Sequence, residues 1–190
     1  NTFRWENTPF LRIDDIVQSI YHEKNGITWL GNSNGLYRYD SQIDYNYNLD
    51  YPVLIRKVTL GKDSVLFGGP PGGAGGTYFN EIPELKYKDL NYKFVSLDQP
   101  EALKPELTYE YNSLTFEFAA PTFVNEDATI YQYFLEGFDE ESSNWSQETK
   151  AVYTNLPAGK YTFRVTAKNI YKHPGQEGTY EFKIIPPFYD

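Results

Sequence analysis

Residues 156–168 read LPAGKYTFRVTAK, and this stretch decides the fold. From position 161 onward every second side chain is apolar, so an extended chain would present one apolar and one polar face. The alternation predicts a half-buried antiparallel strand over 161–168. Immediately before it, Pro157 and Gly159 favour a sharp turn, because proline fixes φ and glycine is permissive. Tyr161 then lies where a tyrosine corner would place it.

Shorter segments of similar pattern surround this strand. Turn residues separate them, and no segment has a clear helical pattern. Their number approaches what a two-sheet sandwich needs, so we predict an all-β fold. The other strands are expected at 53–60, 64–67, 94–97, 107–111, 113–118, 131–137, 151–153 and 179–185.

The first 50 residues carry a separate pattern of three short strands, at 15–21, 27–31 and 36–40. Asn25-Gly26 and Asn34-Gly35 separate them and favour hairpins, because type I′ turns need positive φ at both central residues. This strand spacing is typical of one blade of a β-propeller.

Only one copy of the blade pattern is present in the sequence. A blade buries its faces against neighbouring blades, so a single copy cannot close a ring, and repeat arrays need several units to be stable. We therefore expect the last blade of a truncated propeller, packed against the sandwich or another chain, with some apolar surface exposed. The expected division is residues 1–50 for the blade and 51–190 for the sandwich.

The composition narrows the class of protein. The 18 Tyr and 13 Phe suit strands better than helices. With 17 Lys and Arg against 26 Asp and Glu, the net charge of -9 repels phosphate backbones, so nucleic acid is not an expected partner. Zero cysteines exclude disulfides, thiolate catalysis and cysteine-based zinc sites. Because the sequence has no signal peptide, no bilayer-spanning apolar run and no methionine, we expect a piece of a longer protein.

The polar residues predict no catalytic, cofactor or metal site. His22 and His173 stand without ligand partners at suitable spacing, so both are expected at the surface. The acidic run Asp139-Glu140-Glu141 fits a turn better than a calcium site. Asp14-Asp15 fits a blade turn better than paired catalytic carboxylates. The glycine-rich residues 68–76 lack the Gly-Lys-Ser/Thr ending of a phosphate-binding loop.

The second half of the chain carries a set of aromatic residues and glycines: Tyr131, Tyr133, Gly137, Trp145, Tyr153, Gly159 and Tyr161. This set resembles the three-Y domain. That module is similar to a fibronectin type III or immunoglobulin-like sandwich, and the family places it just outside the membrane in hybrid two-component sensors. LEGFD at 135–139 and PPF at 186–188 favour it over a plain fibronectin domain.

The blade pattern resembles the repeat of the sensor-type β-propeller, with Leu30 and Asn32 in place of the usual Ile and Thr. Propeller followed by three-Y domain is the order that this sensor family shows. The resemblance implies a non-catalytic chain without cofactors, the C-terminal part of a periplasmic sensor region whose histidine kinase activity lies elsewhere in the parent protein.

The resemblance also implies how a signal would pass. A glycan-derived oligosaccharide would bind the propeller outside this chain, and a homodimer through the three-Y domain would pass the change to a membrane helix. The chain would then be membrane-proximal but not membrane-spanning. Pro186, Pro187 and Phe188 would form the transmitting linker, since two fixed φ angles stiffen the exit from the last strand.

Phe134 and Ile185 break the alternation of their strands and are expected to face away from the core. A large apolar residue on an outer face often marks a contact surface, so these two are candidate interface residues. The many tyrosines keep two other classes open: a carbohydrate-binding module, whose exposed rings stack on sugars, and an accessory domain of a secreted glycan-processing enzyme. An apolar run of about 20 residues soon after Asp190 in the parent protein would favour the receptor.

Overall fold

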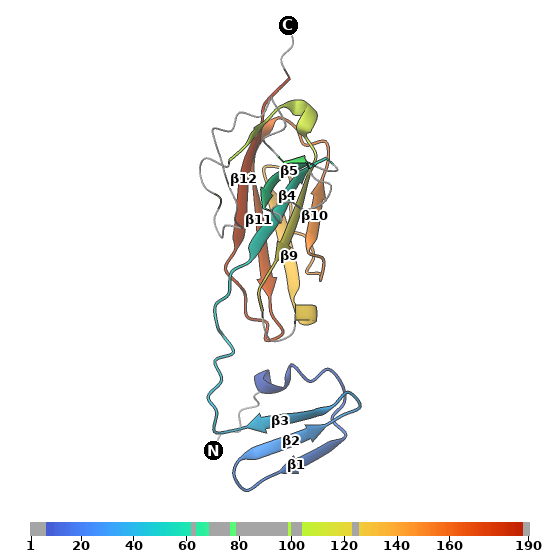
Figure 1. The fold of residues 1–190 in the computed structure, drawn as a ribbon, viewed down its shortest axis with the longest axis vertical. Coiled ribbons are helices and arrows are strands. Elements are labelled where there is room, and N and C mark those ends of the chain that lie inside the picture. Colours follow the sequence, from blue (N-terminus) through green and yellow to red (C-terminus); the bar gives the residue numbers. More distant parts are fainter. Residues whose placement is uncertain are drawn as a thin grey trace.

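The computed structural model of the chain describes residues 7–61, 64–68, 77–78, 99, 104–122 and 126–187. These residues form two units arranged end to end (Figure 1). One is a three-stranded sheet, the N-terminal sheet, and the other is a sandwich of two sheets. Residues 41–53, the linker, run between β3 and β4 and connect the two units. The last strand of the sandwich leads away from the N-terminal sheet, so the C-terminal end of the described chain lies at the far end of the sandwich.

The N-terminal sheet is antiparallel, in the order β1-β2-β3. Leu30 at its centre pairs with Ile20 on one side and with Tyr37 on the other, so these three side chains share one face. The strands predicted at 27–31 and 36–40 are confirmed. The elements of this unit are the 3-10 turn η1 (Thr8–Phe10) and the strands β1 (Ser19–His22), β2 (Ile27–Gly31) and β3 (Leu36–Asp40).

The first strand of the N-terminal sheet is shorter than predicted, because it begins at Ser19 and not at position 15. The Asp15 carboxylate accepts hydrogen bonds from the Ile16 amide at 2.6 Å and from the Ser33 hydroxyl. These bonds hold the preceding residues in a loop. Apolar alternation alone therefore extended the predicted strand too far.

The two predicted hairpins of this sheet are confirmed, but their turns are not of type I′. In the first turn only Gly26 has a positive φ, of 88°. In the second turn no residue does, because the Asn32 side chain accepts both the Asn34 and the Gly35 amide at 2.9 Å and closes the turn from one side. A side-chain acceptor thus replaces the backbone conformation that the sequence suggested.

In the described part of the chain, the sandwich has one sheet in the order β10-β8-β4-β5-β6 and one in the order β7-β12-β11-β9. The predicted fold class, an all-β chain with a fibronectin-like sandwich, is confirmed. Its elements are β4 (Leu54–Leu60), β5 (Ser64–Gly68), β6 (Thr77–Tyr78), β7 (Glu106–Leu107), η4 (Tyr109–Tyr111), β8 (Leu114–Ala119), η5 (Glu126–Ala128), β9 (Ile130–Glu136), β10 (Lys150–Tyr153), β11 (Gly159–Lys168) and β12 (Gly178–Ile184).

The core of the sandwich is aromatic. Phe116 of β8 and Phe163 of β11 stack at 4.1 Å between ring centroids with an angle of 8°, which joins the two sheets at their centre. The alternation in β11 is as predicted: Tyr161, Phe163, Val165 and Ala167 are all buried. At the start of this strand the Tyr161 hydroxyl donates to the Pro157 carbonyl at 2.6 Å, the geometry of a tyrosine corner.

The prediction of a strand over 107–111 is wrong. Pairing of β7 with β12 ends at Leu107, and residues 109–111 form the turn η4, in which the Tyr111 amide donates to the Thr108 carbonyl at 2.9 Å. The spacing of Tyr109 and Tyr111 imitated a strand. The strand predicted at 94–97 and residues 69–76 of the glycine-rich stretch lie outside the described residues. In the described ranges, helical structure is confined to short 3-10 turns, and no helix has the length and apolarity to cross a membrane.

Candidate functional site at the junction of the two units

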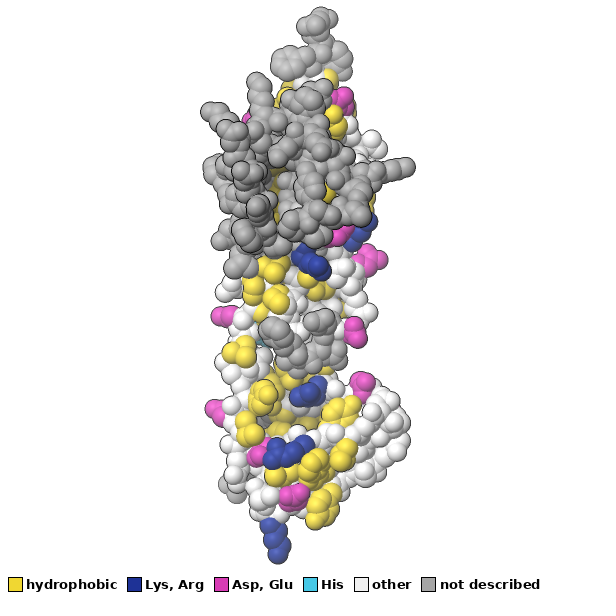
Figure 2. Space-filling view, viewed as in Figure 1, with side chains coloured by type: hydrophobic (Ala, Val, Ile, Leu, Met, Phe, Trp, Pro, Cys, Tyr) yellow, Lys and Arg dark blue, Asp and Glu magenta, His cyan; other side chains and the backbone are white. Residues whose placement is uncertain are grey.

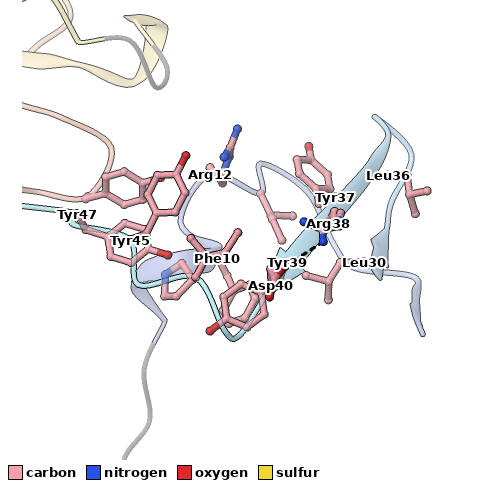
Figure 3. Close-up of a pocket in the computed structure, with 14 residues that line it drawn as sticks. Phe10, Arg12, Leu30, Leu36, Tyr37, Arg38, Tyr39, Asp40, Tyr45 and Tyr47 are labelled. Atoms are coloured by element: carbon pink, nitrogen blue, oxygen red, sulfur yellow. Dashed lines mark hydrogen bonds and ion pairs between the residues drawn. The ribbon is translucent and has the colours of Figure 1, made fainter. Parts of the chain in front are cut away.

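A hollow of about 430 Å³ lies between the N-terminal sheet and the sandwich, and we call it the junction hollow. Strand β3, turn η1, the linker and the loop between β11 and β12 each contribute to its wall (Figure 3). The volume is within the range of small-molecule sites. Its aromatic lining consists of Phe10, Tyr37, Tyr39, Tyr45, Tyr47 and Tyr171.

The rings of the hollow form two groups, one that joins the linker to the sandwich and one within the N-terminal unit. Tyr47 of the linker meets Tyr171 of the sandwich edge-on at 4.8 Å, and Tyr45 stacks on Tyr47 at 5.8 Å. On the side of the N-terminal sheet, Phe10 packs against Tyr39 at 5.1 Å. A movement of the linker relative to the sandwich would therefore change the ring contacts that line the hollow.

The hollow contains two guanidinium groups, and among the described residues only one of them has a carboxylate partner. Arg38 pairs with Asp40 at 2.9 Å, as Figure 3 shows. Arg12 also lines the hollow. Burial raises the pKa of the Tyr47 and Tyr171 hydroxyls, and the positive charge of Arg12 partly offsets this rise. These hydroxyls are therefore protonated at neutral pH. The arrangement suits stacking against a ring-shaped ligand.

The linker ends in an anchor on the sandwich. The hydroxyl of buried Tyr51 lies 2.8 Å from the His173 carbonyl and 3.1 Å from the Ala167 carbonyl, and donates to them. The expectation that His173 lies on the surface is wrong: its side chain is only 20% exposed, and its ring meets that of Tyr51 at 6.3 Å. His22 is exposed as expected and contacts Thr28 at 3.0 Å.

The residues that carry the three-Y resemblance lie in the sandwich and do not converge on the hollow. Tyr131 accepts the Ala120 amide at 3.1 Å, Tyr133 packs on the edge of the core, and Trp145 lies under the Lys168 ammonium at 4.1 Å. Gly159 lies against the ring of Tyr161. They are structural residues of the sandwich.

The turn after β9 explains the LEGFD motif. The Asp139 carboxylate accepts the Leu135 amide and the Tyr153 hydroxyl, both at 2.7 Å. Gly137 has φ of 95°, and a Cβ there would lie 2.6 Å from the Lys160 carbonyl oxygen. Asp139 thus closes a turn.

Across the described ranges, no group of three or more His, Asp or Glu residues is placed to hold a metal ion.

The candidate interface residues lie on the sandwich, away from the hollow. Phe134 is partly exposed and stands opposite Arg164 in the register of β9 and β11, on the outer face of the sheet. Ile185 follows β12, and its amide donates to the Leu107 carbonyl at 2.8 Å. Pro186 and Pro187 are exposed after it, and Phe188 lies outside the described residues.

Sequence reasoning missed the residues of the junction hollow. Tyr45 and Tyr47 alternate with polar residues in the linker, which was a usable signal for one aromatic face. Nothing in the sequence paired them with Tyr171. The sequence also did not reveal that two apolar side chains, Val152 and Phe138, are 59% and 46% exposed. They lie on or directly after β10 and β9, which are edge strands of the two sheets.

Residues 122–185, about a third of the chain, match the Y_Y_Y domain family, so the three-Y resemblance is confirmed for this part. A search of curated proteins found no significant match. Among solved structures, the extracellular domain of a B. thetaiotaomicron protein assigned to a hybrid two-component system is similar, with a TM-score of 0.57, 21% identity and coverage of 88% of this chain and 20% of that one.

A second similar structure is the extracellular domain of a B. thetaiotaomicron protein assigned to a one-component system. It has a TM-score of 0.50 and 18% identity, over 93% of this chain and 21% of that one. At these identities the likeness concerns the fold. The chain spans about a fifth of the length of both structures.

Proposed function

We propose that this chain is the membrane-proximal end of a periplasmic sensor region of a hybrid two-component regulator. In this proposal the N-terminal sheet is the last propeller blade, and the sandwich is a connector that dimerises and relays a change toward the membrane. The chain itself is not an enzyme. Its parent protein carries the kinase, and a glycan-derived oligosaccharide binds a part of the propeller outside this chain.

The observation that carries the proposal is the uncovered apolar surface of the N-terminal sheet. Leu30 is its one buried apolar side chain among the described residues, whereas Ile20, Tyr21 and Leu36 are 67–69% exposed. Figure 2 shows apolar side chains gathered over this unit.

The uncovered side chains lie on both faces of the sheet. Ile20 is in register with Leu30 and so shares its face, whereas Tyr21 is in register with Trp29 on the opposite face. Burying each of these large side chains would contribute about 1.5–3 kcal/mol. A propeller blade has neighbours on both faces, and so this exposure supports a blade removed from its ring.

The sandwich has the geometry of a connector. Its junction with the N-terminal sheet and its exit at Pro186-Pro187 lie at opposite ends (Figure 1). Its outer face is held by ion pairs, including Arg164 with Glu136 and Glu177, each at 2.9 Å. Phe134 interrupts this polar face and is the residue we assign to the dimer contact.

Sedimentation equilibrium of the 190-residue chain, over a wide range of concentration, tests the connector role. Phe134→Asp should weaken the dimer by tenfold or more, because a charge would enter an apolar contact; this is an order-of-magnitude estimate of about 1.4 kcal/mol. Val152→Asp is the matched control, since it also replaces an exposed apolar side chain by a carboxylate but lies on β10 in the other sheet. A strictly monomeric chain, or equal effects of both variants, would contradict the assigned contact.

The junction hollow supports a second candidate, a carbohydrate-binding module. Its rings and the Arg12 guanidinium provide stacking surfaces and a hydrogen-bond donor, which a sugar ring uses. Calorimetric titration with neutral and acidic oligosaccharides would test it. Binding that Tyr47→Ala abolishes and Tyr109→Ala preserves would favour this role, since Tyr109 is exposed at the other end of the sandwich.

A further inference from the structure

The loop between β11 and β12, residues 169–177, touches the linker at two places. At the first, it receives the end of the linker: the Gln176 amide donates to the Tyr51 carbonyl at 2.7 Å, and the Val53 amide donates to the Gln176 carbonyl at 2.9 Å. With the Tyr51 hydroxyl bonded to the carbonyls of Ala167 and His173, both the backbone and the side chain of Tyr51 are fixed. This first contact is an anchor.

The seat of the Tyr51 ring exists because residue 175 has no side chain. A Cβ at Gly175 would lie 2.5 Å from the Tyr51 ring and 3.0 Å from its carbonyl oxygen. Gly175 has no positive φ, so its backbone conformation would accept alanine. The glycine therefore serves the close approach of Tyr51 and not the turn itself.

The second contact is a single pair of rings. Tyr171 meets Tyr47 at 4.8 Å. Residues 48–50 are exposed, and Asp50 lies 3.5 Å from the His173 ring, next to the Tyr51 anchor. The loop holds Tyr171 in place from within, because the Asn169 side chain accepts both the Tyr171 and the His173 amide at 3.0 and 3.1 Å. Unlike the Tyr51 anchor, this contact has no hydrogen bond between its partners in the described contacts, so it can slide.

We propose that residues 169–177 form the coupling element between the two units, with Tyr51 as the fixed point and the Tyr47–Tyr171 contact as the point that registers tilt. The coupling is inferred from the contacts alone, and only its role in signalling rests on the proposed function. A tilt of the N-terminal sheet would push on Tyr171, and β12 begins directly after this loop at Gly178 and leads to Pro186 at the far end. The loop therefore delivers the displacement to the strand that exits toward the C-terminus.

The coupling can be measured on the 190-residue chain as a distance between two spin labels. The sequence has no cysteine, so Lys24→Cys on the N-terminal sheet and Thr154→Cys on the sandwich, both exposed, give a single labelled pair. Double electron–electron resonance on labelled chain diluted with unlabelled chain should give one narrow distance distribution. The dilution removes distances between the copies of a dimer.

Three variants of this labelled chain test the two contacts separately. Tyr171→Ala should broaden the distribution around the parent distance, because the tilting contact is lost while the anchor remains. Gly175→Ala should move the distribution to new distances, because the Tyr51 ring is expelled from its seat. Tyr109→Ala in η4, at the other end of the sandwich, should leave the distribution unchanged.

A broad distribution in the parent chain, or parent-like distributions in both Tyr171→Ala and Gly175→Ala, would overturn the coupling. If Gly175→Ala impairs folding, Tyr51→Phe replaces it, since it keeps the ring and removes the hydroxyl bonds; a parent-like distribution for that variant and for Tyr171→Ala would equally overturn the proposal. The labels measure the distance between the two units, and this distance can be interpreted without any assumption about signalling. A narrow, variant-sensitive joint in a chain that never dimerises would therefore contradict the connector function and leave the coupling intact.

Discussion

The N-terminal sheet and the sandwich use the same alternation of side chains, but only one of them buries it. The sandwich surrounds a cluster of buried apolar residues that extends from Tyr51 to Ile184, whereas the N-terminal sheet buries Leu30 alone among the described residues. Hydrophobic burial is the main favourable contribution to folding. The sandwich is therefore stabilised from within, and the N-terminal sheet depends on surfaces that pack against it.

Truncation of a core ring in the sandwich should show the largest difference in stability from a matched truncation in the N-terminal sheet. Phe163→Ala is expected to lower the free energy of unfolding by about 3–5 kcal/mol, because Phe163 is fully buried and stacks on Phe116. The control is Leu36→Ala in the N-terminal sheet, which is 68% exposed and should change it by less than about 0.5 kcal/mol. Denaturant unfolding followed by tryptophan fluorescence measures both. Similar losses in the two variants would contradict the comparison.

Glycine substitutions should give the next largest contrast. Gly137→Ala is expected to cost about 2–3 kcal/mol, because φ is 95° and the added Cβ would meet the Lys160 carbonyl. Gly35→Ala in the N-terminal sheet meets no atom within 4 Å and has no positive φ, so the free energy of unfolding should hardly change. Thermal unfolding of the pair would expose an error if the Gly35 variant proved the less stable one.

Removal of the Tyr153 hydroxyl should have a smaller effect at neutral pH. Tyr153→Phe is expected to cost about 1.5 kcal/mol, because the hydroxyl donates to the Asp139 carboxylate at 2.7 Å. Asp139 keeps its bond to the Leu135 amide, so the turn should persist. Urea unfolding of this variant beside Tyr109→Phe, an exposed tyrosine, isolates the contribution of the buried bond.

The same tyrosine should make stability depend on alkaline pH. Burial, and next the bond to Asp139, raise the pKa of the Tyr153 hydroxyl, so the folded chain favours the protonated form. This stabilisation is complete below the unfolded pKa of about 10 and is lost as the pH rises above it. Unfolding measured between neutral pH and about pH 11 should show a smaller decline for Tyr153→Phe than for the parent. An equal decline would place the sensitivity in other groups.

Polar substitutions on the N-terminal sheet should have the smallest effect on folding. Ile20→Thr and Leu36→Thr are expected to change the free energy of unfolding by less than about 0.5 kcal/mol, because both side chains are already exposed. They should instead lower the binding of a hydrophobic dye, whose fluorescence reports uncovered apolar surface. Unchanged dye fluorescence, or a large loss of stability, would show that these side chains are packed.

The sequence predicted the parts of the fold in which local pattern and burial agree. Strands at 27–31 and 36–40 were found with their predicted bounds, and β11 was found with its buried alternation intact. The prediction failed where a side chain bonds to the backbone, as Asp15 does before β1 and Asn32 does in the turn between β2 and β3. Such bonds depend on partners that periodicity does not identify.

The junction hollow was beyond prediction for a different reason. Its contact between Tyr47 and Tyr171 joins segments that are distant in the sequence, and the packing of the two units decides it. Contact with the Tyr51 ring likewise leaves the His173 side chain only 20% exposed, whereas composition and spacing placed it at the surface. The Tyr161 corner was accessible from sequence because its acceptor, Pro157, is only four residues away.

Native-state hydrogen exchange tests the contrast between the two units most directly. The backbone amides of β8, β9, β11 and β12 should exchange only through global unfolding, because they cover a shared buried core. The amides of β1, β2 and β3 should exchange through local opening at a much lower free energy, since that sheet lacks the neighbours that its exposed apolar faces require. Equal protection of the two units would contradict the account, because the N-terminal sheet would then be stable without a neighbouring surface.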